Sequence, residues 1–363
     1  MAKRVGVDKW LFGTVLCLVL FGLVMVFSTS AVMAKAQFGS PYRFVLTQLV
    51  FVVLGLIALS LLMRIDYRRY NNPKVVFPAV AITALLLIGV FFMGGMNGAH
   101  RWIRVGGLTL QPSELAKPLI VLFLAYFLQN RMHQIDDWKG TLLQAVAVPL
   151  LFIALILKEP DLGTAMVCAG VTALMLLLAG IQLRYIGIAL AAAAPLMYYM
   201  LFHVAFRRAR MLAFMNPEAD PRGTGFHILQ SLIAVGTGGF HGLGLMEGRQ
   251  KLFYLPEPHT DFIFATVCEE LGIIGAVLLV ALFVFVGYRG LRAAFLSTDP
   301  FARFFAFGLT TAILIQAFFN ISVVLALLPT KGIPLPFISS GGTSVFITLA
   351  SIGVLLNITR EID

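Results

Sequence analysis

The chain has 363 residues, of which 60% are hydrophobic and 12% are charged, and its formal net charge is +10. Soluble domains are roughly one quarter charged, so this composition excludes an ordinary water-soluble protein. The basic residues are scattered between hydrophobic runs without interleaved aromatic stripes, so we expect no nucleic acid partner.

Ten runs along the chain are apolar and long enough to cross a bilayer, for which about 20 residues suffice. The first run follows a short basic stretch as a signal peptide would, but its 25 residues exceed the apolar region of a signal. We therefore expect an all-α integral membrane protein, a single polytopic domain over residues 1–363 with about ten transmembrane helices. The predicted spans are 10–34, 44–63, 75–94, 112–130, 141–157, 162–183, 185–206, 259–288, 304–328 and 337–359.

Two segments required a decision between helix and loop. Residues 223–246 are uncharged, but they contain seven glycines, each of which costs roughly 1 kcal/mol in a helix interior relative to alanine. We assign them to a loop or re-entrant segment within one long extracytoplasmic connection, about 207–258. Residues 112–130 are kept as a span although they include Glu114 and Lys117.

The distribution of positive charge predicts the orientation. Lys9 precedes the first span, together with Lys3 and Arg4, and four further basic residues fill the short connection at 64–74. By the positive-inside bias these segments, and both termini, are expected in the cytoplasm. This orientation places 14 of the 27 Lys and Arg residues inside and 13 outside, so the overall count hardly discriminates. Eight of the outer residues lie on two loops: Arg101, Arg104, Arg207, Arg208, Arg210, Arg222, Arg249 and Lys251. Either they bind an anionic ligand such as a phosphate, or the long connection translocates regardless of its charge.

A charged pair opens the fourth predicted span. The i, i+3 spacing places Glu114 and Lys117 on one helical face, where they can pair. Pro118 has no N–H to donate to the carbonyl of Glu114, so a kink is expected here. The pair either seals a helix end or faces a cavity in which it orients a phosphate or an acid.

A second polar group precedes the eighth span. Pro256 and Pro258 stop any earlier helix, so Asp261 falls in the cap or first turn. There the helix dipole favours a carboxylate, and we expect Asp261 to be ionised at neutral pH. Two interpretations remain open: a simple N-cap, or a general base or metal-binding carboxylate for a divalent cation (Mg²⁺ or Mn²⁺), supplied with protons by His259.

Residues 328–344 join the last two spans and contain three prolines, Lys331, Ser339 and a Ser/Gly run. They form either a rigid, donor-rich rim for phosphate oxygens or a tight interhelical turn. The glycine-rich residues 236–244 lack the GK[ST] ending of a P-loop, so nucleotide binding has no support.

In these same segments the chain resembles the SEDS family, the shape, elongation, division and sporulation proteins of FtsW/RodA type. The resemblance is carried, in order, by residues 97–103 (NGAHRWI), 111–117 (QPSELAK), 159–164 (EPDLGT), 255–264 (LPEPHTDFIF) and 328–344. It implies a ten-helix, GT-C-like SEDS fold in the bacterial cytoplasmic (inner) membrane. It further implies a peptidoglycan glycosyltransferase that polymerises lipid II with a class B penicillin-binding protein transpeptidase and other divisome or elongasome proteins.

The resemblance also assigns roles to residues. Asp261 matches the family's essential aspartate, and Glu114 and Lys117 match its polar pair in the cavity. Residues 249–251, 254–261 and 328–332 look more like the division branch (FtsW type) than the elongation branch (RodA type), although Ser340 replaces a tyrosine usual in the family. The hypothesis is a catalytic Asp261 with substrate-binding Glu114, Lys117, Arg101, Arg104, His259, Lys331 and Ser339. An elongation polymerase and a flippase for the lipid-linked precursor are the alternatives.

Overall fold

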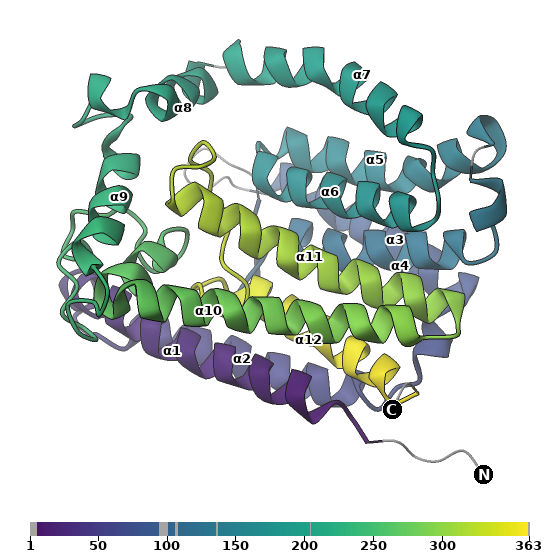
Figure 1. Cartoon of the computed structure of the whole chain (residues 1–363), viewed down its shortest axis with the longest axis horizontal. Coiled ribbons are helices and arrows are strands. Elements are labelled where there is room, and N and C mark those ends of the chain that lie inside the picture. The colour runs from purple at the N-terminus through teal and green to yellow at the C-terminus, as the bar shows by residue number, and fades with distance from the viewer. Residues whose placement is uncertain (1–5, 94–100, 106–107, 136, 204, 362–363) are drawn as a thin grey trace.

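The computed structural model describes residues 6–93, 101–105, 108–135, 137–203 and 205–361. Helices dominate these ranges (Figure 1). In chain order they are α1 Lys9–Phe38, α2 Arg43–Leu62, α3 Pro73–Gly89, α4 Pro112–Leu128, α5 Leu143–Lys158, α6 Leu162–Leu178, α7 Leu183–Phe202, α8 Ala205–Met215, α9 Phe226–Gly238, α10 Ile263–Leu296, α11 Pro300–Val324 and α12 Gly342–Thr359. Strands β1 Ile103–Val105 and β2 Leu108–Leu110 pair as a small antiparallel hairpin before α4.

The helices have the length and composition of membrane spans. Within the described residues, seven are long and apolar enough to cross a bilayer, in α1, α2, α3, α5, α10, α11 and α12, and shorter apolar helices occur in α6, α7 and α9. Each of the ten predicted spans overlaps one of the observed helices. The chain is a multi-pass, all-α membrane protein, as its hydropathy predicted.

The assignment of residues 223–246 to a loop was wrong, because α9 occupies Phe226–Gly238. Five of the seven glycines lie outside this helix, and the other two, Gly236 and Gly238, are in its last turn. A Cβ at Gly238 would overlap the carbonyl oxygen of Cys268, so glycine lets α9 approach α10 closely. The long 207–258 connection therefore contains most of α8 and all of α9.

The core of the bundle forms around α4 and α11. Helix α11 packs against α4, α6 and α10. Small residues permit these close contacts: a Cβ at Gly290 would overlap the side chain of Thr310, and one at Gly308 would overlap that of Val121. Because α4 is enclosed on most sides, Glu114 and Lys117 are buried in protein and do not face lipid.

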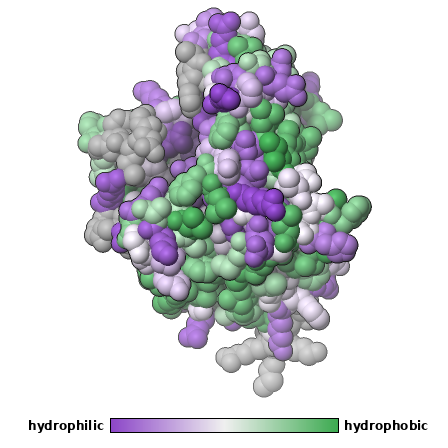
Figure 2. Space-filling model, turned by 90° about the vertical axis from the view of Figure 1, so that its left-hand side faces the viewer, coloured by the Kyte–Doolittle hydropathy of each residue, from purple (hydrophilic) through white to green (hydrophobic). Residues whose placement is uncertain are grey.

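The two termini lie at the same end of the bundle (Figure 1), where the backbone N–H of Asp8 donates to the Thr359 hydroxyl. At the opposite end α4, α6, α10 and α12 all begin. Hydrophilic residues gather over the upper and middle part of that face (Figure 2). The fold therefore brings segments more than 200 residues apart in sequence to one polar end.

Candidate active site

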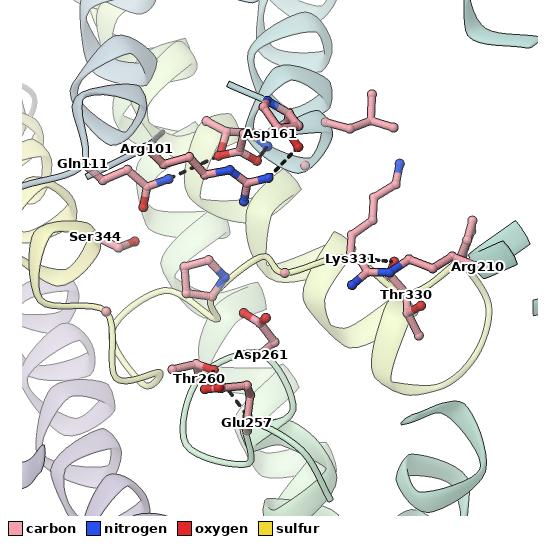
Figure 3. Close-up of a pocket in the computed structure, with 18 of the residues that line it drawn as sticks. Arg101, Gln111, Asp161, Arg210, Glu257, Thr260, Asp261, Thr330, Lys331 and Ser344 are labelled. Carbon is pink, nitrogen blue, oxygen red and sulfur yellow. Dashed lines mark hydrogen bonds between the residues drawn. The ribbon is translucent and has the colours of Figure 1, made fainter. Parts of the chain in front are cut away.

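A cavity of about 720 Å³ lies at this end of the bundle (Figure 3). Its walls come from the starts of α4, α6 and α12, from α8, and from the loops before α10 and α12. Among its lining residues are the polar side chains of Arg101, Gln111, Asp161, Thr164, Arg207, Arg210, Glu257, Thr260, Asp261, Thr330, Lys331, Ser340 and Ser344.

Helix N-termini converge on the cavity. Gln111, Asp161 and Gly341 line it and are the N-cap residues of α4, α6 and α12, while Asp261 lies two residues before the first residue of α10. Each N-terminus carries a partial positive charge and unsatisfied N–H groups. Their convergence favours an anionic group in the cavity.

The backbone around Asp261 is fixed by buried side chains. The amide of Asn320 donates to the carbonyl of Asp261 at 2.8 Å and to that of Ile333 at 2.7 Å. One residue earlier, the hydroxyl of Ser339 donates to the carbonyl of Thr260 at 2.5 Å. These bonds join the loop that carries Asp261 to residues 328–341, so the two proline-rich segments form one rigid rim.

The carboxyl group of Asp261 points into the cavity (Figure 3). It does not cap α10, because the N-cap residue is Phe262 and no side chain makes the capping hydrogen bond. Burial raises the pKa of Asp261 to about 7, helped by the charges of Glu257 and Asp161 and opposed by Arg210 and Arg101. The sequence predicted an ionised Asp261 at neutral pH, whereas the raised pKa brings its titration close to neutrality, because burial removes solvating water and like charges lie nearby.

Basic side chains form the wall across from Asp261. Arg101 donates through Nε to the carbonyl of Glu159 at 2.9 Å, and Arg210 donates to the carbonyl of Thr330 at 3.4 Å. Burial and the neighbouring Arg207 and Arg210 lower the pKa of Lys331 to about 8, so its amine remains mostly charged at neutral pH. Of the long connection's basic residues, Arg207 and Arg210 on α8 line the cavity.

A second carboxylate, Asp161, was not among the predicted site residues. It caps α6 by accepting from the backbone N–H of Thr164 at 3.1 Å and from its hydroxyl at 2.9 Å, and the Gln111 amide donates to it at 3.1 Å. The Asp-x-x-Thr spacing before an apolar run is an N-cap signal that could have placed Asp161 at a helix start. Its position beside the cavity depends on packing between α4 and α6.

Five of the predicted substrate-binding residues do not line the cavity. Glu114 and Lys117 form the predicted ion pair, at 2.8 Å, and Lys117 also donates to the side chain of Gln316. Gln316 in turn donates to the carbonyl of Pro334 at 2.8 Å. The pair thus does not line the cavity but is linked through Gln316 to Pro334, which does.

The other three lie around this rim. Arg104 is exposed on β1, and Ser339 is buried in the bonds that fix the loop of Asp261. The His259 ring is buried against Phe44, with 4.5 Å between ring centroids, and burial lowers its pKa. Direct contact of these three side chains with a substrate in the cavity is therefore not supported by their positions, because none of them lines the cavity and Ser339 and His259 are buried.

The described residues contain no group of three or more His, Cys, Asp or Glu side chains placed to hold a metal ion. The possible divalent cation at Asp261 thus has no protein-built ligand cage in this part of the chain. A cation there would take one ligand from Asp261 and depend on oxygens of a bound substrate for the rest.

The fold and the site define a polytopic α-helical membrane protein with an acid–base group in a cation-walled cavity. The FTSW_RODA_SPOVE family profile, described as "Cell cycle protein", matches residues 8–363, and the chain belongs to this family. Residues 97–100 of the first motif lie outside the described residues, whereas the later motifs line or support the cavity.

Known relatives are similar in sequence to nearly the whole chain. A protein of Geobacter metallireducens named "Probable peptidoglycan glycosyltransferase FtsW" is 44% identical over 94% of this chain and 91% of its own length. Stage V sporulation protein E of Bacillus subtilis is 38% identical over 99% of this chain and 98% of its own.

Solved structures share the fold. A chain from "Structural coordination of polymerization and crosslinking by a peptidoglycan synthase complex" matches with a TM-score of 0.80 and 28% identity, over 98% of both chains. The rod shape determining protein RodA of Thermus thermophilus matches with a TM-score of 0.72 and 26% identity, also over 98% of both.

Proposed function

We propose that the chain is a peptidoglycan glycosyltransferase that polymerises lipid II, the undecaprenyl-pyrophosphate-linked disaccharide peptide, into glycan strands for septal wall synthesis. The family and the names of its relatives support the activity, and relatives at 42–44% identity named FtsW support the division role. The observation that carries the mechanism is the carboxyl of Asp261, with a pKa near 7, facing a cavity walled by cations and helix N-termini.

Asp261 is the general base. Its carboxylate takes the proton of the acceptor sugar's 4-hydroxyl as that oxygen forms a bond to the anomeric carbon of the second lipid-linked sugar. The bond from that carbon to the lipid pyrophosphate breaks, and the pyrophosphate leaves with the bonding electrons. A base works best when its pKa lies near the operating pH, and such help is worth about 10²–10⁴ in rate.

The cationic wall stabilises the leaving group. Arg101, Arg210 and Lys331 come from three different elements and face one cavity, so they can surround the two phosphates as negative charge builds up. The N-termini of α4, α6 and α12 add fixed partial charges that need no reorganisation during the reaction.

The cavity opens at the outer leaflet in this proposal, with both termini in the cytoplasm of a bacterium. The basic 64–74 connection lies at the end of the bundle where the termini lie, because Arg68 pairs with Glu361 at 2.9 Å. Its positive charge supports a cytoplasmic location for that end. Lys3 and Arg4 lie outside the described residues. With the basic connection assigned to the cytoplasm, the start of α10, and with it Asp261, is proposed to lie on the opposite side.

The proposed partner is a class B penicillin-binding protein transpeptidase, which would cross-link the strands as they form, within a larger divisome. The solved peptidoglycan synthase complex, which contains a chain of this fold, supports such an assembly. A divalent cation, Mg²⁺ or Mn²⁺, is proposed to accompany the substrate's pyrophosphate at Asp261. The proton transfer to Asp261 does not depend on it, and titration of either metal into chelator-treated protein tests it.

The decisive experiment supplies the full-length chain in detergent with lipid II and resolves glycan strands on a gel. We expect strands from the wild type and none from Asp261→Asn, which should still bind the lipid. Asp66→Asn is the matched control, because Asp66 is an exposed aspartate at the opposite end of the bundle. Full polymerisation by Asp261→Asn would refute the mechanism. Movement of labelled lipid across vesicles without strand formation would favour the flippase.

A further inference from the structure

A second buried charged cluster lies outside the cavity, at a break in α10. Gly272 has φ 65°, ψ −165°, and divides α10 into a first half-helix, Ile263 to Leu271, and the longer remainder. The positive φ favours glycine, and a Cβ here would also overlap the backbone of residues 240 and 242. Residues 239–251 therefore pass directly against the break.

The break exposes backbone groups that this passing segment satisfies. The N–H of Leu243 donates to the carbonyl of Glu269 and that of Gly244 to the carbonyl of Glu270, both at 3.0 Å. In the other direction, the N–H of Ile273 donates to the carbonyl of Gly239 at 2.9 Å. The end of the half-helix is thus joined to residues 239–244 by main-chain bonds on both sides of the break.

Side chains add a charged contact at the same place. Lys251 Nζ lies 2.6 Å from Glu270 Oε1, and the Ser28 hydroxyl of α1 donates to the same carboxylate at 2.7 Å. Glu270 also accepts from the backbone N–H of Met246 at 3.0 Å. The neighbouring Glu269 accepts from the N–H of Arg249 at 2.8 Å. Both glutamates are 0% exposed, and the contacts of Glu270 with Ser28 and Lys251 are buried.

Stability alone is a weak reason to bury such a pair, because the cost of desolvating two charges offsets much of their attraction, and apolar side chains of similar size often serve as well. In some proteins buried charged groups instead fix one specific arrangement of the segments that they join. The cluster of Ser28, Lys251, Glu269 and Glu270 joins three segments at one point: α1, the half-helix of α10 and residues 246–251.

We propose that the Lys251–Glu270 pair positions Asp261 for catalysis by clamping the half-helix of α10 and the loop that precedes it. Asp261 lies two residues before the half-helix, and Glu270 lies near its other end. Lys251 begins the loop to Asp261, and the N–H of Leu255 donates to the carbonyl of Gln250 at 2.7 Å. Lys251 and Glu270 are therefore positioning residues, and they act on Asp261 from both sides of it in the chain.

The half-helix of α10 is long enough for a small tilt to displace Asp261. Nine residues of helix span about 13 Å, so a tilt of about 4° moves the Asp261 end by about 1 Å. Misplacing a catalytic group by about 1 Å can cost on the order of 10²-fold in rate. The proposal rests on the proposed function, because it gives the half-helix the role of placing Asp261, the base of that reaction.

The test compares Lys251→Met and Lys251→Arg in the full-length chain with lipid II. We expect Lys251→Met to lower kcat by about 10- to 100-fold with KM within about twofold of wild type, and Lys251→Arg to recover most of the loss. The matched control is Arg289→Met, which breaks a similar ion pair, 2.6 Å to Asp8, at the other end of α10. It should leave kcat unchanged. If Lys251→Met does not fold, the double variant Lys251→Met/Glu270→Met removes both charges and carries the same prediction.

Amide hydrogen exchange gives a second measurement that needs no activity. Loss of the clamp should raise exchange in residues 252–262, whereas Arg289→Met should not. Wild-type kcat together with unchanged exchange in a folded Lys251 variant would overturn the inference. An inactive wild type would count against the proposed function instead, and the exchange comparison would still decide whether Lys251 holds the loop of Asp261.

Discussion

Replacing Glu257 by glutamine removes a negative charge beside Asp261 without changing the size of the side chain. Glu257 is, after burial, the largest cause of the raised pKa of Asp261. Without that charge the carboxylate form of Asp261 is easier to make, so the pKa falls. Because the proposed base acts as a carboxylate, the acid limb of kcat/KM should move to lower pH.

The size of the expected pKa shift of Asp261 depends on how exposed the Glu257 side chain is. The Glu257 side chain is 63% exposed, so water screens its charge, and we expect a fall of about half a pH unit from a starting value of about 7. At pH 6 the ionised fraction of Asp261 then rises from about 9% to about 24%, which increases kcat/KM about 2.5-fold. At pH 8 the two proteins should differ by less than about 10%.

The assay is the pH dependence of kcat/KM for glycan strand formation, which reports groups of the free enzyme. Glu247→Gln is the matched control, since Glu247 is an exposed glutamate on the same connection and does not line the cavity. An acid limb that stays in place in Glu257→Gln, or that moves equally in Glu247→Gln, would refute the assignment of this limb to Asp261.

Four further changes test the geometry of the cavity. In Gly332→Ala the new Cβ would lie 2.7 Å from Asp261 Oδ2, so we expect the carboxyl to be displaced and kcat to fall about 10- to 100-fold in single-turnover assays. Arg210→Met should raise KM for lipid II about 10-fold, and Lys331→Met should abolish an alkaline limb near pH 8, where the pKa of Lys331 lies. Asn320→Ala leaves the carbonyls of Asp261 and Ile333, one part-buried and one buried, without their donor and should destabilise the protein by about 2 kcal/mol, measured by thermal unfolding in detergent.

A glycine-to-alanine change at a position with free space around it separates these effects from a general loss of stability. Gly89→Ala meets no heavy atom within 4 Å and should have wild-type kcat. Wild-type activity in Gly332→Ala would show that Asp261 does not depend on the close approach of this loop. An unchanged KM in Arg210→Met would remove Arg210 from the substrate site.

The membrane helices could be predicted from the sequence because the bilayer imposes their length and polarity on each segment separately. The pairing of Glu114 with Lys117 also followed from local spacing, since residues three apart on a helix are neighbours. Helix α9 was missed because a count of glycines ignores their positions, and here most of them lie beyond its ends.

Asp261 itself was found from the sequence, as a carboxylate after two prolines at a helix start. Its surroundings were not, because they come from distant parts of the chain: Asp161 from the start of α6, Arg210 from α8 and Gly332 from the loop before α12. The pKa of a carboxyl depends on burial and on charges across the cavity, neither of which is a property of neighbouring residues. Sequence thus determined the membrane fold and the presence of the acid, whereas only the tertiary packing decided that this carboxyl has a raised pKa and faces cations across a cavity.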